Sequence, residues 1–278
     1  MGRTFSEKIL GQRAGQEVRA GDIVVVSPDC ILSHDNTAAI INEFRKLEIS
    51  RVRRAEKLVI VLDHVVPASS EKYALNHKVI REFVAEQGIE NFFDVNQGIC
   101  HQVLSEHGLA APGKIIIGAD SHTTTYGAFG AFSVGVGRSE VASVWATDEL
   151  WLRVPETIKV NLEGNLPPGI YAKDIILKLI GDHGADKANY QAVEFWGEGA
   201  SSLSLASRMV LCNMAAEMGA KNGYFAPDQK VFDFLQRLEV DDYEVVTSDS
   251  DACYSEIITL NLDELEPQVA CPHTVDNV

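Results

Sequence analysis

A short apolar run that ends in a cluster of polar side chains most limits how this chain can fold. Residues 115–117 are three isoleucines, which favour a buried β-strand. Gly118 ends the run, and Asp120, Ser121 and His122 follow it closely. In open α/β sheets, ligands bind outside the carboxyl ends of the strands. The sequence therefore predicts a ligand site immediately after this strand.

Strand and helix patterns alternate through the first half of the chain. We expect strands at 22–27, 57–62 and 114–118, a short one at 92–94, and helices at 4–10, 37–47, 74–86, 97–108 and 138–151. This order favours an α/β fold with a mostly parallel sheet and helices on both faces. Polar pairs also occur at His34-Asp35 and Asp63-His64, at places equivalent to Asp120 in this pattern. We therefore expect all of them to share one crevice.

The composition changes near Pro155, where we place a boundary between two α/β domains, 1–155 and 156–278. In the second domain we expect strands at 157–162, 192–196 and 257–262 and helices at 172–179, 204–219 and 228–238. Glu194 interrupts an apolar strand there, and a buried carboxylate needs hydrogen-bond partners.

Charge and hydropathy exclude several classes of function. The 278 residues include 24 Lys and Arg and 40 Asp and Glu, which gives a formal net charge of −16. Such a chain repels nucleic acid, and we expect no nucleic-acid partner. No apolar run is long enough to span a membrane, and the first residues lack the apolar core of a signal peptide. We therefore expect a cytoplasmic protein with no membrane partner.

The histidines and carboxylates indicate acid–base chemistry. A carboxylate beside a histidine fixes the tautomer and raises the imidazole pKa, so that the imidazolium can donate a proton near neutral pH. This suits protonation of a leaving hydroxyl group. The sequence offers three carboxylates for three histidines, namely Asp63, Asp120 and Glu194 beside His64, His101 and His122.

Other interpretations stay open at this point. Clusters of Asp and His also bind zinc or manganese, so a mononuclear metal hydrolase is possible, although no His-x-His or His-Glu-x-x-His spacing occurs. Ser121 lacks the Gly-x-Ser-x-Gly motif of a serine hydrolase, and no Gly-x-Gly-x-x-Gly follows a strand. Four histidines in polar surroundings are expected at the surface: His77, His107, His183 and His273.

Several motifs resemble one known family. Residues 118–123 (Gly-Ala-Asp-Ser-His-Thr) with 127–130 (Gly-Ala-Phe-Gly) resemble a signature of the aconitase family. The other matching stretches occur in the family's order along nearly the whole chain: 63–64, 98–102, 193–197 and 211–219. Within the family, the motifs are most similar to the large subunits of its 3-isopropylmalate dehydratase and homoaconitase branches.

The resemblance implies an aconitase-like fold, with two three-layer α/β domains, and hydro-lyase chemistry. Such enzymes remove water from a hydroxy di- or tricarboxylate and add it back at the neighbouring carbon. A [4Fe–4S] cluster on three cysteines binds the substrate hydroxyl. The resemblance further implies three acid–histidine pairs (Asp63 with His64, Asp120 with His101, Glu194 with His122), His64 as proton donor, and substrate contacts from Ser121 and His34.

The cysteines depart from the family pattern. Cys30, Cys100, Cys212, Cys253 and Cys271 contain no Cys-x-x-Cys pair and none lies in the family's ligand motifs. We therefore expect a chain that lacks the third, cysteine-ligand domain and binds neither a cluster nor another metal alone. A small subunit with the swivel domain is the expected partner. A homoaconitase, a 2,3-dimethylmalate-type dehydratase, or an inactive binding or assembly fragment remains an alternative.

Overall fold

The structure, a computed structural model that describes residues 2–278, has a five-stranded parallel sheet in its first half. The strands lie in the order β4-β3-β2-β5-β6, and each neighbouring pair is parallel. Their bounds are β2 (Cys30–Ser33), β3 (Leu58–Val61), β4 (Asn91–Phe93), β5 (Ile115–Gly118) and β6 (Phe132–Gly135). The predicted parallel sheet is confirmed, and the isoleucine run forms the buried strand β5.

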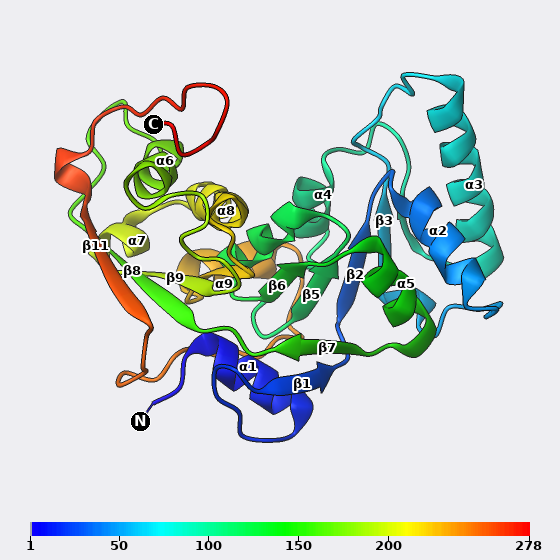
Figure 1. The fold of residues 1–278 in the computed structure, drawn as a ribbon, viewed down its shortest axis with the longest axis horizontal. Coiled ribbons are helices and arrows are strands. Elements are labelled where there is room, and N and C mark those ends of the chain that lie inside the picture. The colour runs from blue at the N-terminus through cyan, green and yellow to red at the C-terminus, as the bar shows by residue number, and fades with distance from the viewer. Residues whose placement is uncertain (1) are drawn as a thin grey trace.

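Helices cover both faces of this sheet (Figure 1). Successive side chains of a strand point to opposite faces, so Ile31 packs with one apolar cluster and Leu32 with another. The Ile31 face lies under α2 (Thr37–Lys46), α3 (Glu71–Gln87) and α5 (Arg138–Thr147). The Leu32 face lies against α4 (Cys100–Glu106) and the 3₁₀ helix η2 (Ser121–Phe129).

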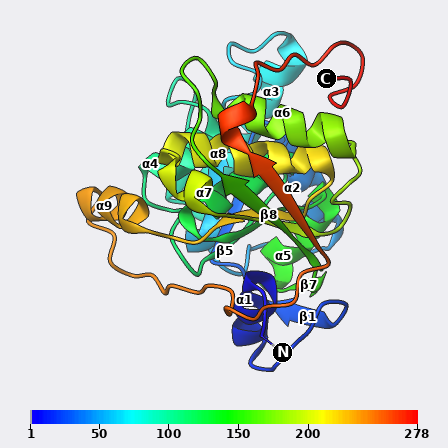
Figure 2. The ribbon, with the colours of Figure 1, turned by 90° about the vertical axis from the view of Figure 1, so that its left-hand side faces the viewer.

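A second parallel sheet, of four strands in the order β10-β9-β8-β11, forms from the residues after 156. Its strands are β8 (Thr157–Glu163), β9 (Ala192–Trp196), β10 (Asn222–Phe225) and β11 (Glu256–Asn261), and Figure 2 shows β8 and β11 side by side. The helices of this half are α6 (Ala172–His183), α7 (Glu198–Ser202), α8 (Leu205–Met214), η3 (Ala215–Met218), α9 (Gln229–Arg237) and η4 (Leu262–Glu264). None of the helices within residues 2–278 is both long and apolar enough to cross a membrane.

The two sheets meet through η2 and share one apolar core. At Gly127 the helix lies so close to β10 that an added Cβ would sit 1.5 Å from the carbonyl oxygen of Gly223. Strand β7 (Leu150–Arg153) and strand β8 belong to different sheets on the two sides of residue 155. We therefore propose 1–155 and 156–278 as the two domains, packed into a continuous core.

A two-stranded antiparallel ribbon beside α1 (Phe5–Ala14) corrects two predictions. The predicted helix over 138–151 is too long, because Asp148 adopts a left-handed backbone (φ 62°) after α5, and the chain then turns into β7. The predicted strand at 22–27 is β1 (Ile23–Val26), but it pairs with β7 and not with the parallel sheet. The sheet strand that leads to His34 is β2, which the sequence analysis missed.

Candidate active site

The candidate residues lie where the strand order of the first sheet reverses. The chain runs from β2 to β3 and β4 on one side, and then returns to place β5 on the other side of β2. Such a reversal leaves a crevice outside the carboxyl ends of the two central strands. His34 follows β2, His64 follows β3, and Asp120 follows β5, so their side chains meet at this edge.

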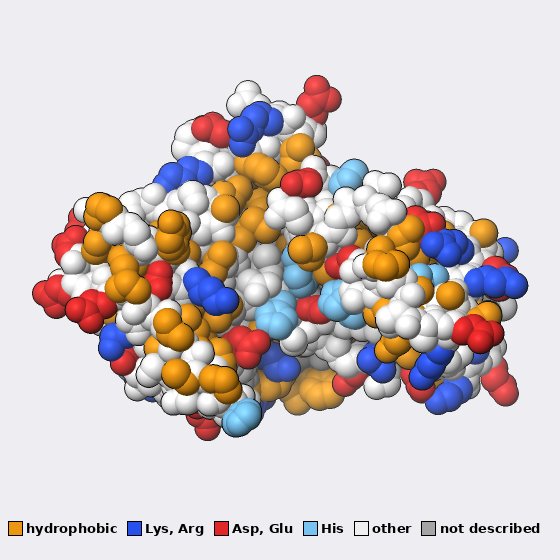
Figure 3. Space-filling view, turned by 90° about the horizontal axis from the view of Figure 1, so that it is seen from above, with side chains coloured by type: hydrophobic (Ala, Val, Ile, Leu, Met, Phe, Trp, Pro, Cys, Tyr) orange, Lys and Arg blue, Asp and Glu red, His pale blue; other side chains and the backbone are white. Residues whose placement is uncertain are grey.

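One carboxylate, that of Asp120, lies at the centre of four imidazoles. Its Oδ1 is 3.1 Å from His101 Nε2 and 3.8 Å from His122 Nδ1. Its Oδ2 is 3.3 Å from His64 Nε2 and 3.7 Å from His34 Nε2. Figure 3 shows histidine side chains gathered around a hollow in one face of the molecule. His64, His101 and His122 therefore converge on the carboxylate of Asp120.

Local backbone geometry holds Asp120 in place. It is the N-cap of η2, and its Oδ1 accepts a hydrogen bond of 2.7 Å from the backbone N–H of His122. Gly135 allows the loop to approach β6, because an added Cβ would lie 2.5 Å from the Asp120 carbonyl oxygen. Although burial raises the pKa of Asp120, its hydrogen bonds with His101 and His122 and the nearby imidazoles hold that pKa well below the usual range. Asp120 is therefore a fixed negative charge.

His64 forms the predicted pair with Asp63. The Nδ1 of His64 lies 2.6 Å from Oδ1 of Asp63, whose Oδ2 accepts from the backbone N–H of Cys100 at 2.6 Å. Partial burial lowers the pKa of His64, but the hydrogen bond that its Nδ1 donates to Asp63 and the charges of Asp63 and Asp120 raise it overall. Because the His64 side chain is also 40% exposed, its imidazolium can reach a ligand in the crevice.

His34 stacks on His64, with ring centroids 3.7 Å apart and 17° between the planes. Burial, and then repulsion by His64, lower the pKa of His34 to about 4. His34 is therefore neutral at neutral pH. A neutral ring against the His64 imidazolium can accept or donate a hydrogen bond without adding charge.

His77 is buried, so its predicted surface position is wrong. Its Nε2 lies 2.5 Å from Oδ1 of Asp35. The Oδ2 of Asp35 accepts from the backbone N–H groups of Asp63 and His64, at 3.0 and 2.7 Å. Asp35, which follows β2, thus fixes the backbone of the Asp63–His64 pair. His77 is buried because it is a hydrogen-bond partner of this carboxylate.

The predicted hydrogen bond between His122 and Glu194 is wrong. The Nε2 of His122 lies 3.0 Å from Oε1 of Glu217, which comes from η3. The sequence analysis missed Glu217, although it lies within the matching stretch 211–219. It also missed Tyr126, whose hydroxyl lies 3.0 Å from Nδ1 of His101.

Glu194 lies inside the protein and has its own partners. It is in the middle of β9, so its side chain leaves through a face of the sheet and not at the carboxyl end. Its two oxygens accept from the backbone N–H of Phe5, from Trp196 Nε1, and from the hydroxyls of Ser248 and Tyr254, at 2.8–3.1 Å. Burial raises its pKa, although these donors oppose the shift. Glu194 therefore joins α1, β9 and the segment before β11.

The carboxylates that could hold a metal already have protein partners. Within residues 2–278, one group of at least three His, Cys, Asp or Glu has ligand atoms within 4.8 Å of one another, namely His34, Asp35, Asp63 and His64. Both oxygens of Asp35 and both oxygens of Asp63 accept the hydrogen bonds described above. The Nδ1 atom of His34, by contrast, is buried without a hydrogen-bond partner among the described residues.

The cysteines do not fit an iron–sulfur cluster. Such a cluster needs several thiolates around one site. Burial raises the pKa of the Cys30, Cys100 and Cys212 thiols, and Cys253 and Cys271 are exposed. Across the described residues, no cysteine belongs to a group of three potential metal ligands. The thiols of this chain therefore do not form a set of ligands for an iron–sulfur cluster.

Comparisons with known proteins identify the family of this chain. A sequence profile of the aconitase family (aconitate hydratase) matches residues 7–278. The chain is 49% identical over 279 residues to "3-isopropylmalate dehydratase large subunit 1" of Methanopyrus kandleri, covering 100% of this chain and 67% of that protein. It is 51% identical over 251 residues to "Probable methanogen homoaconitase large subunit" of Methanosarcina mazei, covering 90% and 64%.

The chain thus spans about two thirds of the length of these relatives. The profile match covers nearly every residue, and the stretches that carry the match include those that hold Asp63, Asp120 and His122. The order of the motifs, the parallel sheets and the relatives all lead to the same assignment: this chain belongs to the aconitase family.

Proposed function

We propose that this chain forms part of a hydro-lyase that removes water from a hydroxy di- or tricarboxylate and adds it back at the neighbouring carbon. The observation that carries the proposal is the Asp120-centred group of imidazoles, in which His64 has a raised pKa and reaches the crevice. Relatives named 3-isopropylmalate dehydratase make 3-isopropylmalate the first candidate substrate. The homoaconitase relative makes a homoaconitase the second candidate.

His64 is the proposed proton donor. Its Nδ1 is held by Asp63, so Nε2 is the nitrogen that faces the crevice. In the dehydration, a base that we propose comes from a complementary polypeptide takes the proton from the neighbouring carbon, and the C=C bond forms as the C–O bond breaks. The leaving hydroxyl takes the Nε2 proton and departs as water, and the neutral imidazole remains against Asp120. In the hydration, the same nitrogen takes a proton from water. A donor whose pKa lies above the ordinary histidine value suits this task near neutral pH.

The other residues of the crevice have supporting roles in the proposal. His101 and His122 lie near Oδ1 of Asp120, whereas His64 lies near Oδ2. The other ring nitrogen of His101 lies against the Tyr126 hydroxyl, and that of His122 lies against Glu217. Ser121, at the first turn of η2, has its Oγ 3.3 Å from His122 Nδ1 and is exposed next to Asp120. We assign Ser121 and the neutral His34 to substrate contacts.

Aconitase-family enzymes generally use a [4Fe–4S] cluster, which supplies a Lewis acid for the substrate hydroxyl. Because this chain's cysteines offer no ligand set, we propose that the chain alone holds no stoichiometric cluster. Anaerobic reconstitution with iron and sulfide, followed by iron and sulfide assays and visible absorption, tests this. About four irons per chain with the broad cluster absorption would contradict it.

Turnover is expected only with complementary polypeptides. The relatives are named large subunits, and we propose a small subunit as the partner of this chain. The decisive assay combines the chain, anaerobically, with a small subunit and with the part of the M. kandleri relative that it does not cover. The complete relative serves as positive control, and the chain alone, tested with 3-isopropylmalate, homocitrate and citrate, is the negative control.

Formation of the unsaturated acid is followed by its ultraviolet absorbance. We expect turnover with the wild-type chain, and about 10²–10⁴-fold less with His64→Ala at similar KM, because proton donation acts in the transition state. No product from the combination, while the complete relative is active, would favour the non-catalytic alternative. Unchanged turnover in His64→Ala would refute the role of His64.

A further inference from the structure

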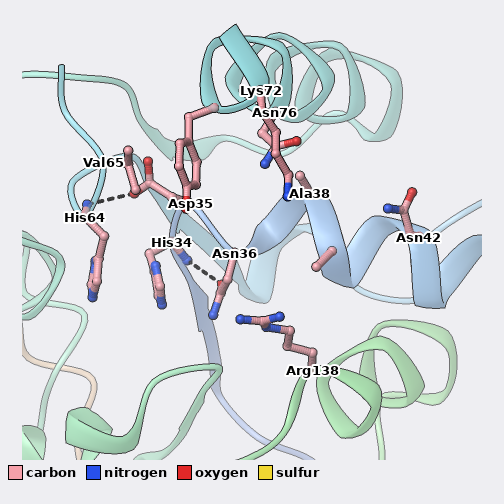
Figure 4. A pocket seen from close by; sticks show the side chains of 12 residues that line it. His34, Asp35, Asn36, Ala38, Asn42, His64, Val65, Lys72, Asn76 and Arg138 are labelled. Atoms are coloured by element: carbon pink, nitrogen blue, oxygen red, sulfur yellow. Dashed lines mark hydrogen bonds between the residues drawn. The ribbon is translucent and has the colours of Figure 1, made fainter. Parts of the chain in front are cut away.

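A cavity of about 650 Å³ opens beside the stacked rings of His34 and His64 (Figure 4). Its walls come from the exits of β2 and β3, from α2 and α3, and from the first residue of α5. The residues that matter for its charge are Asp35, Lys72 and Arg138, and those that matter for hydrogen bonding are Asn36, Asn42 and Asn76.

Two cations of this cavity lack the carboxylate partners found elsewhere in the molecule. Lys57 pairs with Asp148 at 2.8 Å, and Arg81 pairs with Asp94 at 2.7 Å. Within residues 2–278, no carboxylate lies within 4.0 Å of the charged nitrogens of the exposed Arg138 and Lys72, as is also true of Arg237 on α9. In a chain with a formal net charge of −16, two such cations at one cavity mark it as a place for an anion.

The acidic residue of the cavity does not neutralise them. The Asp35 side chain is only 4% exposed, and both of its oxygens accept hydrogen bonds from His77 and the backbone of 63–64. Figure 4 shows Arg138 extending from α5 toward Asn36. The exposed charge of the cavity is therefore positive, and amide groups surround it.

The cavity is continuous with the catalytic crevice. His64 and His34 line the cavity and also contact Asp120. Asn36 lines the cavity and also contacts the loop that holds Asp120, because its Nδ2 donates to the carbonyl oxygen of Ala119 at 2.6 Å. A small molecule whose hydroxyl lies at His64 can thus extend a second polar group into the cavity.

We propose that this cavity is a carboxylate subsite, in which Arg138 and Lys72 bind the carboxylate of the hydroxy acid that lies farther from the reacting hydroxyl. The proposal rests on the proposed function for the identity of the ligand. An arginine can form two parallel hydrogen bonds with a carboxylate, and the lysine adds a compact second charge. Arg138 and Lys72 would then help to select dicarboxylates over monocarboxylates.

Binding of two small probes to this chain tests the subsite without any turnover. Malate has a hydroxyl and two carboxylates, whereas 2-hydroxybutanoate has a methyl group in place of the far carboxylate. Titrations are followed by the imidazole NMR signals of His34 and His64, with His183 and His273 as distant references. We expect wild type to bind malate more tightly than 2-hydroxybutanoate.

The variant Arg138→Gln should weaken the binding of malate about ten-fold, the factor for one lost charge-assisted hydrogen bond, and leave the affinity for 2-hydroxybutanoate unchanged. Lys72→Met should act in the same direction, and Arg138→Lys should restore part of the affinity. Arg237→Gln removes an equal charge from α9, in a different cavity, and should change the affinity for neither probe.

Several results would overturn the subsite. These are equal affinity of wild type for the two probes, the same loss for both probes in Arg138→Gln, or an equal effect of Arg237→Gln. Tighter binding of inorganic phosphate than of malate would also overturn the assignment to a carboxylate. A reconstituted enzyme without dehydratase activity, combined with the expected probe affinities, would refute the proposed function and leave the subsite standing.

Discussion

Glu194 provides a stability prediction that can be worked out from individual atoms. Its Oε1 accepts from the backbone N–H of Phe5 at 3.0 Å, and its Oε2 accepts from Trp196 Nε1 at 2.9 Å. Ser248 and Tyr254 donate through hydroxyls, which can turn and accept instead. The two N–H groups cannot accept; Trp196 Nε1 donates to Glu194, whereas the Phe5 N–H also donates to Ser248 Oγ at 2.6 Å.

Glu194→Gln keeps the shape of the side chain but turns one oxygen into an NH₂ group. Whichever position the NH₂ takes, either Phe5 or Trp196 faces a second donor. One buried donor without an acceptor costs about 1–3 kcal/mol; because the Phe5 N–H can keep Ser248 Oγ as its acceptor, we expect the free energy of unfolding to fall by up to about that amount. Glu194→Ala leaves the Trp196 N–H unpaired, while the Phe5 N–H keeps Ser248 Oγ at 2.6 Å, so its expected cost is about 1–3 kcal/mol before the cavity is counted.

Urea unfolding at pH 8 measures these losses, followed by both far-ultraviolet circular dichroism and tryptophan fluorescence. Glu163→Gln, at the exposed end of β8, is the matched control and should change the free energy by less than about 0.5 kcal/mol. Amide hydrogen exchange at Phe5 adds a local readout and should accelerate in both Glu194 variants. A Glu194→Ala chain no less stable than the control would refute the assigned hydrogen bonds.

Two further predictions concern the catalytic crevice. The pKa of His64 should lie above 6.5 and should fall in Asp63→Asn, because Asp63 raises it. The stability that this pair contributes should be fully present below the unfolded-state pKa and should be lost as the pH rises through the folded-state pKa. A difference in stability between wild type and His64→Gln that does not change with pH would contradict this. Asp35→Asn places an NH₂ group opposite either His77 or the backbone N–H groups of 63–64. It should therefore lower the free energy of unfolding by about 1–3 kcal/mol and shift the imidazole NMR signals of His64. The control Asp182→Asn, at an exposed position on α6, should do neither.

The sequence alone predicted the parts of the fold that depend on apolar periodicity. The isoleucine run, the β-α order and the parallel pairing follow from such patterns, and the structure confirms them. Strands with small or polar residues gave no such signal: β6 (Phe-Ser-Val-Gly) and β10 (Asn-Gly-Tyr-Phe) were both missed. They form because η2 and the neighbouring strands bury them, which is a tertiary effect.

The candidate site was predicted where its residues directly follow strands. Asp63-His64 and Asp120 were placed correctly because the ends of parallel strands meet. Partners from other elements could not be found in this way. Glu217 reaches His122 from η3, and His77 reaches Asp35 from α3, across 95 and 42 residues of sequence. Glu194 looked catalytic because it is a lone carboxylate in an apolar strand, yet its partners are structural.

The central claim is that the charge of Asp120 acts on the imidazoles around it and, together with Asp63, raises the pKa of His64. The direct measurement is an NMR titration of the histidine rings in wild type and in Asp120→Asn, with Asp182→Asn as control. In wild type we expect a His64 pKa above 6.5 and a His34 pKa of about 4. Because Asp120 raises both, each pKa should fall in Asp120→Asn and stay unchanged in the control. A His64 ring that titrates at the same pH with and without the Asp120 carboxylate would contradict the account.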